Sequence, residues 1–413
     1  MTRNRTSELA PVLRASHLTM IAVVASFAWF IKGLETATNY LFFQDDPKLG
    51  TAVNGVAACL TLYLAVLVVL ASGSSEVKRV WSRPARWILA YATLAGVSLL
   101  WTQSYSLVSA CGYWVSFIAE LAVIALLLRY HQAEDFAPAA LKGFVWASVV
   151  LALVAWMAPG TYELRMGEQE YLHPNTIGNQ FGLAALFSIF LARRYPNRHY
   201  WNWISIGLVF SLLKTLSKAS VISFFFAAGF YFLRHSKLSA RKQLRIGLVA
   251  ALMLLVSWSF IEPYMEMYTE KEANVETLTG RTVIWAVSSE IAAERPWLGH
   301  GFSSYISVVP TFFGEFVARH AHNDFLQQFF SYGLVGLLLS LTIYVSFFRH
   351  LRRSAPSPQL GLAYALLIYG LLHGLTDASP TELMLPSCMI LLLAEWVQGC
   401  RRSANALVTT SVG

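Results

Sequence analysis

Residues 51–71 read TAVNGVAACLTLYLAVLVVLA, a run of 21 residues without one charged side chain. A helix of about 20 apolar residues is long enough to cross the hydrocarbon core of a bilayer. The run therefore predicts a membrane-spanning helix rather than an element of a soluble core.

Similar apolar runs recur along the chain of 413 residues. They begin near His17, Thr51, Arg86, Ser109, Gly143, Asn175, Tyr200, Ser217, Ile246, Asp324, Gly361 and Leu383. The composition agrees, because 56% of the residues are hydrophobic and only 13% are charged, whereas soluble domains carry about 25% charged residues. We therefore expect an all-α, polytopic membrane protein of about twelve spans, with 1–413 forming a single integral membrane domain.

The basic residues indicate how these spans are oriented. If the N-terminus is cytoplasmic and the chain crosses alternately, 22 of the 31 Lys and Arg residues fall in cytoplasmic segments. Cationic loops are retained on the cytoplasmic side, so we expect both termini there. The net charge of +8 then reflects orientation in the membrane and does not indicate a nucleic-acid partner. The outer face keeps nine basic residues, which are Lys32, Lys48, Arg165, Lys214, Lys218, Lys271, Arg281, Arg295 and Arg319.

One outer loop, 262–322, is far longer than the usual connection of about 4–6 residues. Within it, apolar residues recur at helical spacing across Arg281–Glu294, and Pro296 is expected to end that helix. An amphipathic helix of this kind lies on the membrane surface, with Trp285 at headgroup depth, or packs over the helix bundle. The pattern leaves both placements open.

The loop ends in a polar cluster, Arg319-His320-Ala-His322-Asn323, directly before a predicted span. A neutral imidazole at a membrane interface can accept a proton near neutral pH. Asn323 is suited to hold an imidazole ring or a substrate hydroxyl, and Arg319 is suited to pair with an anion. The alternative is that a histidine here makes only a capping or headgroup contact.

The spacing of His320 and His322 also fits a metal site. Two ligands are too few, however, and the sequence shows neither a cysteine nor a clear third ligand beside them. We therefore expect no metal and no other cofactor.

Further outer-face residues point to an anionic ligand. Lys214 and Lys218 lie at a tight turn between two spans. Arg281 opens the amphipathic helix, where its guanidinium and the helix-end amides are both suited to phosphate. The stretch His173–Asn175 starts another span from the outer side, with Arg165 shortly before it.

Several of these stretches resemble the O-antigen ligase and O-antigen or exopolysaccharide polymerase superfamily in order and spacing. The strongest are LTGRTVIW at 278–285, ERPWLGHGF at 294–302, HAHNDFL at 320–326 and YGLVG at 332–336. Weaker similarity is carried by HPNTIG at 173–178 and LSKAS at 216–220.

The resemblance implies a glycosyltransferase of the bacterial inner membrane that acts at the periplasmic face. Members move a glycan from undecaprenyl diphosphate to a sugar hydroxyl, without a metal. The histidine of the loop matches His322, which would take the acceptor proton, and the arginine of its Gly-Arg-Thr stretch matches Arg281. Lys218 stands where many members have arginine. It retains the positive charge but cannot form the bidentate hydrogen bonds of a guanidinium group.

Three functions stay open on this basis. The stretches 278–285 and 294–302 slightly favour a polymerase, which extends a glycan on its lipid carrier. A ligase would instead transfer the glycan to lipid A-core. A flippase of the lipid-linked glycan is the alternative of another class, and Glu120, a carboxylate within a predicted span, is the feature that favours it.

Overall fold

The computed structural model describes residues 5–72, 81–158, 165–168, 171–234, 241–242, 278–312, 317–378 and 383–410. The described chain is helical almost throughout. Its helices are α1 (Arg5–Phe42), α2 (Pro47–Ser72), α3 (Arg83–Ser98), α4 (Leu107–Tyr130), α5 (Ala133–Met157), α6 (Pro174–Arg194), α7 (Tyr200–Lys214), α8 (Lys218–Arg234), α10 (Leu278–Glu294), α11 (Tyr305–Val308), α12 (Asp324–Arg352), α13 (Pro358–Thr376) and α14 (Met384–Thr410).

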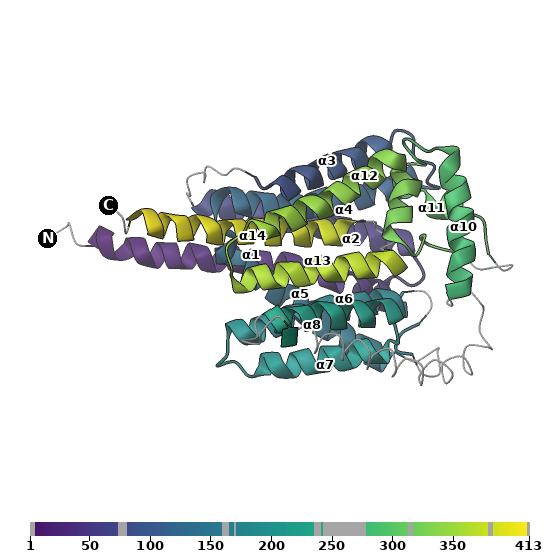
Figure 1. The fold of residues 1–413 in the computed structure, drawn as a ribbon. Coiled ribbons are helices and arrows are strands. Elements are labelled where there is room, and N and C mark those ends of the chain that lie inside the picture. The colour runs from purple at the N-terminus through teal and green to yellow at the C-terminus, as the bar shows by residue number, and fades with distance from the viewer. Residues whose placement is uncertain are drawn as a thin grey trace.

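The long helices run side by side as one bundle, with α10 lying across one end (Figure 1). Helix α1 packs on α5, α2 on α4, α6 on α7 and α8 on α13. The start of α1 and the end of α14 lie together at the opposite end of the bundle from α10 (Figure 1). The helical part of the long loop therefore caps one end, which we call the α10 end.

Six of the described helices are long and apolar enough to cross a membrane, so the chain is a multi-pass membrane protein. These spans are Leu18–Phe42, Lys48–Ala71, Leu107–Tyr130, Ala133–Met157, Asp324–Arg352 and Pro358–Thr376, and α14 adds the shorter apolar stretch Met384–Gly399. The runs predicted near Arg86, Asn175, Tyr200 and Ser217 form α3, α6, α7 and α8, which are shorter or less apolar. The run near Ile246 lies outside the described residues. Twelve spans therefore stay a prediction.

Burial distinguishes central from peripheral helices. In the most apolar part of α13, 61% of the residues are buried, against 22% in α2. Val56 and Leu70 of α2 are 69% and 73% exposed, as expected of apolar side chains that face lipid. Helix α13 is thus a central helix of the bundle, and its end lies at the site described below.

Lys32 is one position where the sequence-based topology is wrong. The charge pattern predicts this lysine on the outer face, but it lies inside the span Leu18–Phe42 of α1. Its ammonium group is 3.0 Å from Glu120 of α4 and 2.9 Å from Glu35. A charge within a span needs a partner of opposite sign, and Lys32 supplies it for Glu120.

Helix α12 is interrupted at Gly333. The φ of 62° and ψ of −158° at this residue are essentially restricted to glycine. A Cβ atom there would lie 2.3 Å from the carbonyl carbon of Trp297. The interruption leaves backbone groups that a continuous helix would pair internally, and a membrane protein has to pair them elsewhere.

The loop that follows α10 provides the missing partners. The amide of Leu334 donates to the carbonyl of Pro296 over 2.7 Å. The amide of Gly301 donates to the carbonyl of Ser331 over 2.8 Å. The stretch 294–302, which we call the loop clamp, therefore pairs the backbone groups at the interruption in α12, and α10 ends at Glu294, before the predicted stop at Pro296.

Replacing Gly333 by alanine should destabilise the protein, because the new methyl group overlaps the backbone at Trp297. We expect the free energy of unfolding to fall by about 1–3 kcal/mol or more, measured as a lower thermal unfolding midpoint. Gly207→Ala in α7 is the matched control, since nothing lies within 4 Å of a Cβ atom there. Equal midpoints for the two variants would show that the interruption does not need glycine.

Candidate active site

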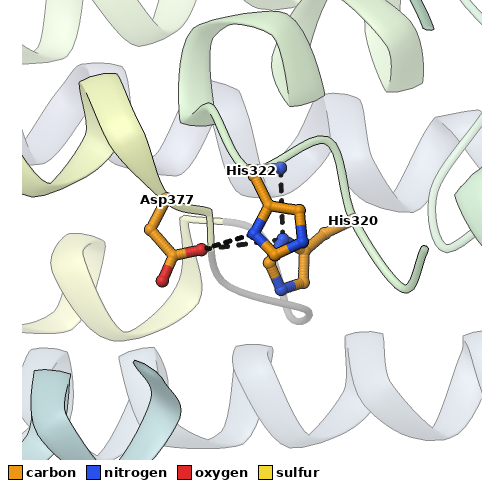
Figure 2. Close-up of side chains that lie close together, drawn as sticks. All are labelled: His320, His322 and Asp377. Carbon is orange, nitrogen blue, oxygen red and sulfur yellow. Dashed lines mark hydrogen bonds and ion pairs between the residues drawn. The ribbon is translucent and has the colours of Figure 1, made fainter. Parts of the chain in front are cut away.

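The side chains of His320, His322 and Asp377 meet at the α10 end of the bundle (Figure 2). The histidines come from the loop before α12, and Asp377 directly follows the last residue of α13. The Nδ1 atom of His322 is 3.1 Å from Oδ1 of Asp377, which is hydrogen-bonding distance. Both side chains are mostly buried, with 12% of His322 and 4% of Asp377 exposed.

This contact determines which nitrogen of His322 is left for chemistry. An ionised carboxylate can only accept a hydrogen bond, so Nδ1 of His322 donates to Asp377. In a neutral imidazole the other nitrogen, Nε2, then carries the lone pair. The arrangement leaves Nε2 of His322 able to accept a proton, with the ring held by its hydrogen bond to Asp377.

His320 plays a different part from its neighbour. Its Nδ1 accepts a hydrogen bond from the backbone amide of His322 over 3.3 Å, so this nitrogen is unprotonated. Burial holds the pKa of His320 well below its usual range, which agrees with a neutral ring. The 3.9 Å separation of this Nδ1 from Asp377 is therefore no ion pair.

Asp377 is kept ionised by its surroundings. Burial alone would raise the pKa of its carboxyl, but the hydrogen bond from His322 opposes burial, and the pKa lies below its usual range. A carboxylate at the C-terminal end of a helix is disfavoured by the helix dipole. Arg281 of α10 offsets this, because its guanidinium donates to the last carbonyl of α13, that of Thr376.

The loop that carries His322 is held in a strained conformation. His322 has a φ of 50°, in the left-handed region that few residues other than glycine adopt. Asn323, the next residue, is the N-cap of α12, and its Oδ1 accepts a hydrogen bond from the amide of Leu326. Its Nδ2 donates to the carbonyl of Leu375 over 3.0 Å. Asn323 therefore ties the histidine loop to the end of α13.

A second group of predicted residues lies beside the first. The guanidinium of Arg165 donates to the carbonyl of Thr215, next to the turn that carries Lys214 and Lys218. Both lysines are exposed. Helix α6 approaches this turn closely at Gly178, where a Cβ atom would lie only 2.9 Å from Ser217. The start of α6 and the turn between α7 and α8 are thus adjacent.

His173 joins the two groups. It begins α6, and its Nδ1 accepts from the amide of Asn175, which is itself buried. The pKa of His173 is lowered to about 4, mainly by burial and also by Arg165 and Arg319, while Asp377 acts in the opposite direction.

The expectation that no third metal ligand lies beside His320 and His322 is wrong. Asp377 supplies the third ligand that the sequence does not show, since ligand atoms of His320, His322 and Asp377 all lie within 4.8 Å of one another. The hydrogen bonds already engage the Nδ1 atoms of both rings, one as a donor and one as an acceptor. Metal independence stays a prediction.

The amphipathic helix predicted over Arg281–Glu294 is confirmed as part of α10. Its Ile284 and Ser288 are fully buried, and Ser288 shares a 2.6 Å hydrogen bond with Tyr305. Of the two placements left open, the structure shows the helix packed over the bundle.

A match to a known protein family includes much of this site. A family model described as O-antigen ligase matches residues 203–341. The chain is 26% identical over 328 residues to the O-antigen ligase of Pseudomonas aeruginosa (strain PAO1), which covers 75% of this chain and 77% of that protein. It is 23% identical over 294 residues to the exopolysaccharide production protein ExoQ of Rhizobium meliloti (strain 1021), which covers 65% of each chain, just under two thirds.

These matches confirm the resemblance to the O-antigen ligase and polysaccharide polymerase superfamily. The residues matched by the family model include Lys218, Arg281 and His322 but end before Asp377. Sequence reasoning missed Asp377 as well. The available signal was a Thr-Asp pair at the outer end of a predicted span, which is also typical of a solvated loop.

Protonation of His173 should weaken the folded state. With a pKa lowered from 6.5 to about 4, the folded protein binds this proton less readily than the unfolded chain. The contribution of neutral His173 to the free energy of unfolding is therefore complete above pH 6.5 and is lost as the pH falls toward 4. Protonated Nδ1 also cannot accept from Asn175.

We expect His173→Asn, which keeps an N-cap acceptor but cannot titrate, to show a smaller drop in thermal midpoint between pH 7.5 and pH 5 than the native protein. Midpoints measured at both pH values check this. An identical drop in the two proteins would exclude His173 as the titrating group.

Proposed function

We propose that this protein is a periplasmic-face glycosyltransferase that moves a glycan from undecaprenyl diphosphate to a hydroxyl of a sugar acceptor. The observation that carries the proposal is the 3.1 Å contact between His322 and Asp377 beside Arg281. It gives an oriented base and a cation at one end of a membrane-embedded bundle, where a lipid diphosphate would lie. The relationship to an O-antigen ligase supports the same chemistry.

In the proposed reaction, the acceptor hydroxyl gives its proton to Nε2 of His322 as its oxygen attacks the anomeric carbon. The bond between that carbon and the diphosphate oxygen breaks, and undecaprenyl diphosphate leaves. Attack from the side opposite the leaving group inverts the anomeric carbon. Asp377 keeps the ring oriented and stabilises the imidazolium that forms.

The cations at the α10 end are proposed to bind the diphosphate. The guanidinium of Arg281 is held by its hydrogen bond to the carbonyl of Thr376, so it is already in place before the reaction begins. Lys218 and Arg319 are proposed to add positive charge, with Lys214, Arg165, His173 and Asn175 on the adjacent wall. His320 and Asn323 are proposed to hold the loop and contact glycan.

The proposal includes the architecture around the site. The whole chain, 1–413, is taken as one domain of the bacterial inner membrane, with cytoplasmic termini and 262–322 as its periplasmic loop. No metal takes part. The flippase alternative depended on Glu120, and the ion pair with Lys32 accounts for that carboxylate without a transport role.

Polymerase and ligase remain two forms of the proposal. The slight preference for a polymerase came from the stretches around Arg281 and the loop clamp. The matches to an O-antigen ligase and to ExoQ support the two forms about equally. The acceptor, either a second lipid-linked glycan or lipid A-core, distinguishes them.

His322→Ala should abolish glycan transfer by the purified protein, because it removes the proposed base. We expect the rate to fall by about 100-fold or more, with binding of the lipid-diphosphate donor largely unchanged. Transfer is measured with a defined donor and acceptor in the presence of a chelator, and binding is measured separately. Full transfer by His322→Ala would overturn the mechanism.

Incubation with the lipid-linked repeat alone separates the two forms. A ladder of longer glycans would show a polymerase, whereas transfer that requires added lipid A-core would show a ligase. Loss of activity with the chelator and its return with a divalent metal would contradict metal independence.

A further inference from the structure

The first turns of α12 contact the loop that carries His320 and His322. Gln327, one helical turn after the N-cap, is only 3% exposed. Its side-chain carbonyl accepts a hydrogen bond from the backbone amide of Ala321 over 2.9 Å. Ala321 lies between His320 and His322 and is fully buried. Gln327 therefore contacts the middle of the loop.

The orientation of this carboxamide follows from its partners. A backbone amide can only donate, so the oxygen of Gln327 must face Ala321. The nitrogen then faces Ser331, one turn further along α12, and donates to its hydroxyl over 3.3 Å. Both ends of the side chain are engaged, and the helix holds the oxygen at a fixed place.

The loop needs such a support because its conformation is not favourable by itself. The left-handed backbone of His322 persists only when surrounding contacts enforce it. Without the Gln327 oxygen, the buried amide of Ala321 would lack an acceptor, which is a costly state that the loop would relax to avoid. Relaxation would rotate the ring of His322 away from Asp377.

We propose that Gln327 is a positioning residue, which sets the His322–Asp377 contact by holding the amide of Ala321. The inference rests on the proposed function for its effect on rate, since the hydrogen bonds of Gln327 among the described residues are to Ala321 and Ser331 and not to His322 or Asp377. It assigns a role to a glutamine that lies within an apolar span and outside the predicted site.

The test compares Gln327→Leu with Gln327→Glu and Gln328→Leu. Leucine removes the acceptor at similar volume, whereas glutamate keeps an oxygen for Ala321 and can accept from Ser331. Gln328, the adjacent residue, is fully buried, and neither end of its amide has a hydrogen-bond partner among the described residues. Its replacement is the matched control for loss of a buried amide in α12.

For Gln327→Leu we expect kcat to fall on the order of 10- to 100-fold, with little change in KM or in donor binding. Gln327→Glu should keep most of the rate at its own pH optimum, and Gln328→Leu should match the native protein. A kcat for Gln327→Leu equal to that of the native protein would overturn the proposal. So would equal losses in both leucine variants, since they would reflect a general need for buried amides in α12.

A second readout does not depend on transfer. Nitrogen NMR spectra of histidine-labelled protein report the tautomer of His322, with His322→Ala identifying its signal. We expect a proton on Nδ1 in the native protein and a shifted tautomer equilibrium in Gln327→Leu. An unchanged signal would overturn the positioning role. A changed signal, together with full transfer by His322→Ala, would support the positioning role and overturn the proposed function alone.

Discussion

A buried carboxylate at the end of a helix has to be compensated by donors from elsewhere in the chain, and Asp377 imposes this constraint here. Helix α13 places it at the α10 end of the bundle, where His322 donates to it and Arg281 donates to the preceding carbonyl. One carboxylate thus brings together the long loop and the central helix. The same contacts orient a base next to a cation, so the group that stabilises this end of the structure also organises the proposed chemistry.

The interruption of α12 explains why the long loop can serve that role. Gly333 leaves backbone groups unpaired, and the clamp at 294–302 pairs them. The same clamp reaches the segment after α3, where the hydroxyl of Thr102 donates to the carbonyl of Phe302 over 2.6 Å. The loop is therefore fixed to two helices before it enters the site. A fixed loop can hold His322 in a backbone conformation that a free loop would not keep.

Local sequence patterns predicted the helices, whereas contacts between residues distant in sequence depend on how the helices pack. The charge-free run at 51–71 forms α2, and the helix at Arg281–Glu294 forms α10, because each depends on residues close in sequence. Asp377 is 55 positions from His322, so their contact depends on how α12 packs against α13. Lys32 was misplaced for a related reason. Counting charges by position cannot show that its side chain turns inward toward Glu120. The sequence pattern singles out His322 and Arg281, and the resemblance implies their roles, whereas the contact of Gln327 with Ala321 depends on the folded structure.

The account depends most on His322 and Asp377 acting as one unit, and a double-mutant cycle on transfer rate tests this most directly. His322→Ala, Asp377→Ala and the double variant are compared with the native protein in one assay, with donor binding measured for each. If Asp377 acts through His322, the double variant will transfer no more slowly than His322→Ala alone. A loss in the double variant equal to the product of the two single losses would show independent roles and would contradict the account.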